Sequence, residues 1–378
     1  MCKPIFLWIL CLGLINSPLY AQSTKGSDKA SVSASPSQLD AQLVQAAKKA
    51  IDRGILFLQK QQKADGSYEH HVGLTAMTLL AMRESPKAYG VGSGPFISKA
   101  VQWMSAQVRA DGSISGEATP TYNTALAIMA LHALNPKMYK QLIEGGQRFL
   151  VHYQSDEDQK YTKGDKYYGG IGYGGDERPD LSNLQYALEA LKRTDYDPKS
   201  DVWAKAELFV KRCQNYTEED DQDTLARPWA SNDGGFIYEP GSSRAGGTKS
   251  YGAMTFAGLK SLIFARPDSQ KDPRVQAAWK WIQQNYDFNT HPGMGTTAYF
   301  YYLQTAASAL EAYGSPLVAQ GDKKRNWGSD LLVKLISLQK DSGAWQNENR
   351  KYWEGNQVLI TSRAIIAMNH VFRAFGIK

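Results

Sequence analysis

Four residues of a type that can move a proton stand where apolar stretches of the sequence begin. They are His71, Asp180, Tyr251 and Tyr299. A histidine and a tyrosine can act as a base and an acid, and a carboxyl group can act as an acid when its surroundings tune its pKa. The same positions can also be purely structural, because Asp and other short polar residues commonly cap helix N-termini. We expect these four residues to be the catalytic candidates.

Six further residues occupy equivalent positions and are expected to contact a ligand. Aromatic side chains offer an apolar face with a polar tip, which suits a hydrocarbon or a sugar ring. Asn and Ser can donate hydrogen bonds to a ligand, or they can only cap helices and fill the neck of the fold. The six are Tyr122, Asn123, Ser182, Asn183, Tyr302 and Gln357.

A run of carboxylates and a single thiol are weaker candidates. The acidic run at 218–223 is either a solvated loop or a divalent cation site. Cys213 is the only cysteine beyond residue 21, so it has no intramolecular disulfide partner there and is expected to behave as a small buried apolar residue. No Cys–His spacing suits zinc, and the sequence predicts neither a metal site nor a cofactor.

The elements that position these residues follow from a repeat. Six times, an apolar helical stretch leads into a Gly-centred turn and then into a second helical stretch. The first helix of each pair is amphipathic, as the stripe of Ile51, Ile55 and Leu58 illustrates, whereas the second is apolar nearly all round. Six buried helices inside six amphipathic ones predict an all-α fold, an α/α toroid. The turns lie at 64–67, 110–113, 169–172, 232–236, 291–294 and 341–345.

Two of these turns resemble known repeats. The segment from Gln339 through Gly343 to Trp345 is similar to the Gln–Trp repeat of squalene-hopene and related triterpene cyclases, with weaker copies at Gln61 and Gln107. The segment 169–191 resembles the Gly-Gly-Phe repeat of protein prenyltransferase β-subunits. The chain therefore resembles the terpenoid cyclase and protein prenyltransferase superfamily, including its squalene oxidase-type repeats, over about residues 45–372.

The resemblance implies two chemistries, and the sequence departs from both. Triterpene cyclases use the central acid of an Asp-x-Asp-Asp-Thr-Ala motif; the position of this acid is Ser182 in the third repeat and non-acidic in the others. Protein prenyltransferases hold zinc with Asp, Cys and His, and the corresponding positions lie near Thr248 and Ser250, which do not suit zinc. We therefore expect neither squalene cyclisation nor a zinc-dependent prenyl transfer.

Three functions stay open on the sequence. The first is a toroid that binds an apolar or isoprenoid-like ligand in its barrel, which an apolar tunnel would favour. The second is a glycan-active, lyase-like enzyme in which His71 and a tyrosine exchange protons while Arg178 or Arg244 neutralises a carboxylate, and an open cleft would favour it. The third is a non-catalytic scaffold for a partner protein, with a filled neck.

The N-terminal composition predicts export. Residues 1–21 are expected to be a signal peptide, residues 22–40 a polar disordered linker, and residues 41–378 the toroid domain. The protein is then expected outside the cytoplasm, in a periplasm or the extracellular space. The formal net charge of +6 is spread along the chain, so neither nucleic-acid binding nor a stable membrane anchor is expected. The oligomeric state is left open.

Overall fold

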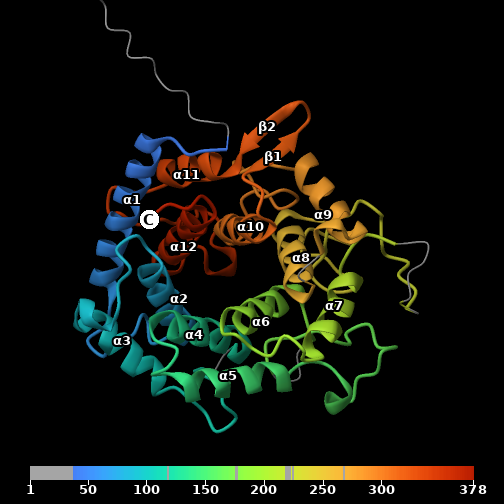
Figure 1. Ribbon diagram of the computed structural model, residues 1–378, viewed down its shortest axis with the longest axis horizontal. Helices are drawn as coiled ribbons and strands as arrows, with labels where there is room; N and C mark the ends of the chain where they lie inside the picture. Colours follow the sequence, from blue (N-terminus) through green and yellow to red (C-terminus); the bar gives the residue numbers. More distant parts are fainter. Residues whose placement is uncertain (1–36, 117–118, 175–177, 218–222, 224, 267–268) are drawn as a thin grey trace, which may run out of the picture. The chain divides into compact units, whose positions relative to one another are not determined.

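Six apolar helices form a closed inner ring in the computed structural model of the protein (Figure 1). Each contacts the next in chain order, and the last contacts the first. Nearly every residue of the first of them is buried, which is why it is apolar on all sides. The inner helices are α2 (Val72–Arg83), α4 (Pro120–Leu134), α6 (Leu181–Arg193), α8 (Gly252–Ala265), α10 (Tyr299–Tyr313) and α12 (Gln357–Ala374).

Six amphipathic helices surround this ring, each burying one face against it. In the first of them Ile51, Ile55 and Leu58 are buried on one stripe. The predicted all-α toroid is thereby confirmed. The outer helices are α1 (Ala41–Gln61), α3 (Pro95–Ser105), α5 (Lys140–His152), α7 (Val202–Arg212), α9 (Pro273–Gln284) and α11 (Trp327–Ser337), and an antiparallel hairpin of β1 (Leu317–Gln320) and β2 (Lys323–Asn326) lies between α10 and α11.

The structure describes residues 37–116, 119–174, 178–217, 223, 225–266 and 269–378. The expected signal peptide and most of the expected linker lie outside the described residues, as does the acidic run except for Asp223. The carboxylate of Asp223 forms a buried ion pair of 2.8 Å with Arg212, and Cys213 is a buried free thiol. Over these residues, no helix has the length and apolar character needed to cross a membrane.

A glutamine side chain explains the recurring motif. Gln339 Nε2 donates to the carbonyl of Gly343 in its own turn, at 2.9 Å, and to the carbonyl of Ala50 in α1, at 2.8 Å. Gln62, and not Gln61, makes the equivalent pair of bonds in the first repeat, to Gly66 and Phe96. Each such glutamine ties a turn to the next outer helix.

The turn glycines allow this close approach. Gly343 has a φ of +89°, and a Cβ there would lie 2.5 Å from the carbonyl oxygen of Arg53 in α1. Gly66 stands in the same relation to Lys99 in α3. Only glycine combines this backbone conformation with this contact. The contact of the last turn with the first outer helix helps to close the ring.

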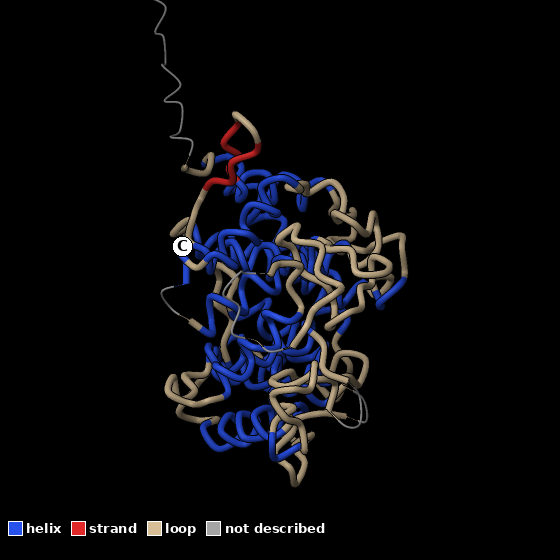
Figure 2. The backbone as a smooth tube through the Cα atoms, turned by 90° about the vertical axis from the view of Figure 1, so that its right-hand side faces the viewer, coloured by secondary structure: helices blue, strands red, loops and turns tan. Residues whose placement is uncertain are grey.

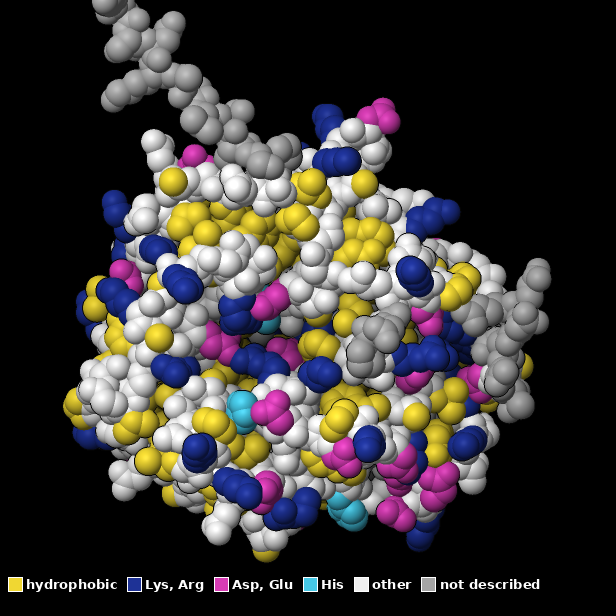
Figure 3. Space-filling view, viewed as in Figure 1, with side chains coloured by type: hydrophobic (Ala, Val, Ile, Leu, Met, Phe, Trp, Pro, Cys, Tyr) yellow, Lys and Arg dark blue, Asp and Glu magenta, His cyan; other side chains and the backbone are white. Residues whose placement is uncertain are grey.

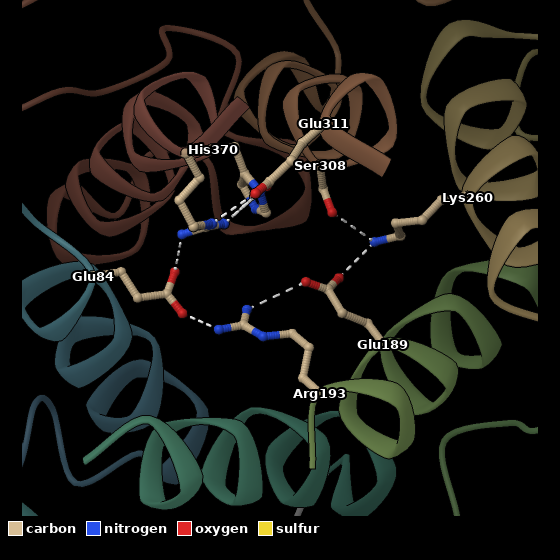
Figure 4. A network of polar contacts seen from close by, with 8 residues as sticks. Glu84, Glu189, Arg193, Lys260, Ser308, Glu311 and His370 are labelled. Atoms are coloured by element: carbon tan, nitrogen blue, oxygen red, sulfur yellow. Dashed lines mark hydrogen bonds and ion pairs between the residues drawn. The ribbon is translucent and has the colours of Figure 1, made fainter. Parts of the chain in front are cut away.

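Charged side chains fill the ring where the inner helices end (Figures 3 and 4). Lys260 in α8, which is almost fully buried, lies 2.6 Å from a carboxylate oxygen of Glu189 in α6 and 3.3 Å from the Ser308 hydroxyl in α10. Burial opposes ionisation of Glu189, but the attraction of Lys260 and Arg193 outweighs it and lowers the pKa of this carboxyl to about 2. Glu189 is therefore ionised at neutral pH.

The charged network continues across the same end of the ring. Glu84, at the end of α2, pairs with Arg193 of α6 and with Arg373 of α12, the latter at 2.8 Å. Arg373 also pairs with Glu311 of α10 at 2.8 Å, and Glu311 contacts His370. We call these residues, with Lys260 and Glu189, the charged plug. Each of its carboxylates has a cationic partner.

Candidate functional site

The opposite end of the inner ring holds a cavity of about 340 Å³. It lies where the inner helices begin, and the connections that lead into these helices include the long segments 153–180, 213–251 and 338–356. Figure 2 shows that loops gather on one side of the helices. Apolar side chains of Leu74, Met254, Met294 and Leu359 contribute much of the lining, together with several tyrosines.

Five of the ten residues expected at the site line this cavity: His71, Tyr122, Ser182, Asn183 and Tyr251. His71 Nδ1 accepts a hydrogen bond from the backbone N–H of Leu74, so the proton of the neutral ring is on Nε2. Burial lowers the pKa of His71, which favours the neutral ring. Burial likewise raises the pKa of Tyr251 well above its usual range, so this side chain remains a neutral hydroxyl.

Asp180 lies next to the cavity but outside its lining. It caps α6, accepting from the backbone N–H of Asn183 at 2.9 Å and from the side-chain amide of Asn183 at 2.7 Å. Burial raises the pKa of Asp180 to about 6, against the opposing effect of these hydrogen bonds. Asp180 can therefore influence a ligand only through Asn183 and its other neighbours.

The remaining four residues do not line the cavity. The hydroxyls of Tyr299 and Tyr302 donate to the backbone carbonyls of Phe288 and Asp287, and the Tyr302 ring stacks on His291 of the cavity wall. Asn123 is buried beside Gly73, and Gln357 is half-buried with its amide 3.3 Å from Gln346. Asn123 and Tyr302 therefore lie behind the lining, and Tyr299 and Gln357 lie outside it.

A buried arginine forms part of the cavity wall. Arg363, in the second turn of α12, donates from Nη1 to Gln304 at 2.7 Å and to the Tyr186 hydroxyl at 3.1 Å, and from Nη2 to the Tyr122 hydroxyl at 3.0 Å. Its guanidinium also lies 5.1 Å from the ring centroid of Tyr301. The single charge in the apolar stretch 360–368 was the sequence signal for this residue.

Two loop residues cap inner helices at the cavity. The Glu354 carboxylate accepts from the backbone N–H groups of Phe300 and Tyr301, the latter at 2.8 Å, at the start of α10. Burial raises the pKa of Glu354, although these bonds oppose the shift. His291 Nε2 accepts from the N–H of Ala253 in α8, and burial lowers the pKa of His291 to about 4, so it caps this helix as a neutral ring.

Aromatic side chains form the rim of the cavity. Trp353 is 59% exposed and its ring meets His71 edge-on, with 5.3 Å between centroids. The preceding Tyr352 is also exposed, and both have positive φ angles, +55° and +63°, which are uncommon for aromatic residues. The guanidinium of Arg244 lies 4.1 Å from the ring centroid of Tyr238. No sequence pattern identified Tyr352 and Trp353, since the path of their loop places them, whereas Arg244 was one of the two arginines expected to neutralise a carboxylate.

The cavity carries few groups suited to a metal. Within the ranges that the structure describes, no cluster of three or more His, Cys, Asp or Glu side chains could hold a metal ion. Thr248 and Ser250 are part of a hydrogen-bonded turn instead, in which Asn215 donates to the Thr248 carbonyl and to the Ser250 hydroxyl.

Solved structures of terpene cyclases share this fold. The type II terpene cyclase MstE of Scytonema, as a variant with its substrate geranylgeranyl dihydroxybenzoate, matches with a TM-score of 0.54 and 10% identity over 88% of this chain and 99% of that one. A second variant of MstE, with its product merosterolic acid A, gives 0.53 and 11% over 89% and 100%. A protein from Actinoplanes gives 0.50 and 13% over 87% and 99%. These similarities show a terpenoid cyclase-like fold.

Comparison by sequence gives no such relative. No family model matches the chain, and no curated protein does.

Proposed function

We propose that the protein binds an isoprenoid-like molecule in the cavity at the N-terminal ends of the inner helices. The observation that carries the proposal is the cavity itself, enclosed by all six inner helices or the loops that lead into them, and lined by Leu74, Met254, Met294 and Leu359 with tyrosine hydroxyls between them. Apolar walls with a few polar groups are typical of sites that bind small apolar molecules.

The structural relatives support this choice of ligand. MstE binds a substrate with a geranylgeranyl chain, and it has the same helical toroid. The structural relatives do not favour the glycan-lyase alternative; of its two arginines, Arg178 is 68% exposed and outside the cavity wall, whereas Arg244 is in the wall. A scaffold with a filled neck fits the open cavity less well. Export stays a prediction from residues 1–21, which lie outside the described residues.

Only some of the expected catalytic residues can transfer a proton to a ligand in the cavity. His71 and Tyr251 line the cavity and can reach a bound molecule, whereas Asp180 and Tyr299 do not. Glu354 is a further acid in the lining, and its raised pKa favours the protonated form more than in water. We therefore propose that His71, Tyr251 and Glu354 are the first residues to test in any reaction of a bound isoprenoid.

A cavity-filling variant tests the binding site. Geranylgeraniol, a neutral isoprenoid alcohol, is the probe, and binding is followed by calorimetry or by tryptophan fluorescence. Met254→Trp puts a larger side chain into the cavity and is expected to weaken binding at least tenfold. Met138→Trp makes the same change at a residue that is 66% exposed and is expected to leave binding unchanged. Equal binding by both folded variants, or no binding by the parent, contradicts the proposal.

A further inference from the structure

We infer that the ligand of this cavity carries an anionic head group, a carboxylate or a phosphate, and that Arg363 anchors it. The inference rests on the proposed function and adds to it the chemical class of the ligand and its orientation. Arg363 is only 7% exposed, and its guanidinium group is nevertheless incompletely hydrogen-bonded.

The guanidinium group of Arg363 does not use all of its N–H donors within the described part of the protein. It carries five N–H groups, and the three hydrogen bonds to Tyr186, Gln304 and Tyr122 use both of those on Nη1 and one on Nη2. Among the described residues, neither Nε nor the second N–H of Nη2 has a hydrogen-bond acceptor. Arg363 lines the cavity, so these donors can serve a ligand. Two N–H donors of one guanidinium match the two oxygens of a carboxylate or phosphate.

Arg363 also lacks a carboxylate in direct contact, although Glu354 is near enough for the two side chains to influence each other's pKa. Its three hydrogen-bond partners are neutral, and no carboxylate in the described part of the chain lies within ion-pair distance of it. A buried guanidinium stays protonated, so its charge must be compensated by neighbours or by a bound anion. Lys260 of the charged plug, which is similarly buried, has Glu189 at 2.6 Å. The fold thus places a carboxylate in direct contact with one buried cation of the ring and none in direct contact with the other, where a ligand can provide it.

The electrostatics of the whole cavity favour an anion. Its ionisable lining consists of Arg363, Arg244 and Glu354, since burial keeps His71 and His291 neutral. The lining itself thus has two cations against one carboxylate when Glu354 is ionised, and Asp180 beside it, whose pKa burial raises to about 6, offsets part of this positive charge only as the pH rises above 6. The inner helices also begin at this end, and their dipoles add positive potential there.

The position of Arg363 sets the orientation of the ligand. It is the seventh residue of α12, so it lies about 9 Å along the helix from its start. The other inner-helix residues of the lining, such as Leu74, Ser182 and Met254, come from the first turn of their helices. Arg363 is therefore at the floor of the cavity, and Trp353 is at the rim. We expect the anionic head to lie at the floor and the apolar chain to extend toward the mouth.

The test compares three probes that differ only in their head group. Geranylgeraniol is neutral, geranylgeranoic acid carries a carboxylate, and geranylgeranyl monophosphate carries a phosphate. We expect the parent protein to bind at least one of the anionic probes ten or more times as tightly as the alcohol. The better of the two identifies the head group. In Arg363→Met we expect this preference to fall to about one, and in Arg363→Lys to be partly retained.

Arg178→Met is the matched control, since it removes an exposed arginine close to the mouth loops, and we expect it to keep the full preference. If Arg363→Met does not fold, the inference is tested by the preference of Arg363→Lys for the anionic probes and by the salt dependence of anion binding to the parent. Alcohol and anions binding the parent equally, or a preference that survives in Arg363→Met, overturns the inference and leaves the proposed function intact. No binding of any probe to the parent overturns both.

Discussion

The two ends of the inner ring use buried charge in opposite ways. At the end where the inner helices finish, Lys260 has Glu189 and each carboxylate of the charged plug has a cation. At the end where they begin, Arg363 is bonded only to neutral groups beside a cavity. Paired buried charges close a barrel, whereas an unpaired one marks the place where a ligand can supply the missing partner.

Helix polarity separates the two ends further. Arg193 and Arg373 lie in the last turns of α6 and α12, where a cation is favoured by the helix dipole. At the other end, Asp180, His71 and Glu354 satisfy the first N–H groups of α6, α2 and α10. The plug therefore stabilises the C-terminal ends through charge, and the cavity end is organised by caps.

The largest effect is expected from breaking the plug. Glu189→Gln leaves Lys260 without its carboxylate, and removing one partner of a buried pair typically lowers the free energy of unfolding by about 3–5 kcal/mol. Adding Lys260→Met in the same chain is expected to recover much of the loss, because no unpaired cation remains. Denaturant unfolding of the single and double variants measures both. Glu348→Gln, at a side chain that is 94% exposed, is the control and should change little. A loss below 1 kcal/mol in Glu189→Gln would show that the plug does not depend on this pair.

The two ends should also differ in pH dependence, with Asp180 as the probe. Its pKa is about 6 in the folded protein against an ordinary value of 3.8, so it favours folding below pH 3.8 and this contribution is lost as the pH rises through 6. The free energy of unfolding of the parent minus that of Asp180→Asn should therefore fall by about 2 kcal/mol from pH 4 to pH 7. The plug has the opposite sign, since the lowered pKa of Glu189 gives stability that is lost as the pH falls from 4.5 toward 2. A difference that does not vary with pH would contradict the burial of Asp180.

The smallest effect is expected at the rim. Trp353 is mostly exposed, so Trp353→Ala should change the free energy of unfolding by no more than about 0.5 kcal/mol. A lost aromatic contact with a ligand is worth about 1 kcal/mol, and binding of geranylgeranoic acid should weaken several-fold. Trp353→Phe keeps a ring at this place and should bind nearly as the parent does. Unchanged affinity in Trp353→Ala would remove the rim from the binding site.

The fold was predictable because its signals are local. Helices that are buried on every side must be apolar on every side, and the predicted stretches at 74–82 and 360–368 lie within α2 and α12. The buried charges of these inner helices were harder to foresee. Glu189 and Lys260 come from different helices, and only the closed ring brings them together.

The site was predictable mainly where a side chain sits at the N-cap or in the first turn of an inner helix, as His71 and Ser182 do. Helical periodicity separates Tyr301, which lines the cavity, from Tyr299 and Tyr302, which do not, and an error of one residue in register exchanges these roles. Glu354 and Trp353 reach the cavity from a loop whose path the sequence does not determine.

A crystal structure of the complex with geranylgeranoic acid tests the central claim most directly. The account predicts one molecule inside the inner ring, with its carboxylate within hydrogen-bond distance of Arg363 Nε or Nη2 and its chain against Tyr122, Tyr301 and Met254. A molecule bound outside the ring would contradict the proposed site. A molecule in the cavity with its carboxylate at the rim and Arg363 unoccupied would contradict the anchoring role of this arginine.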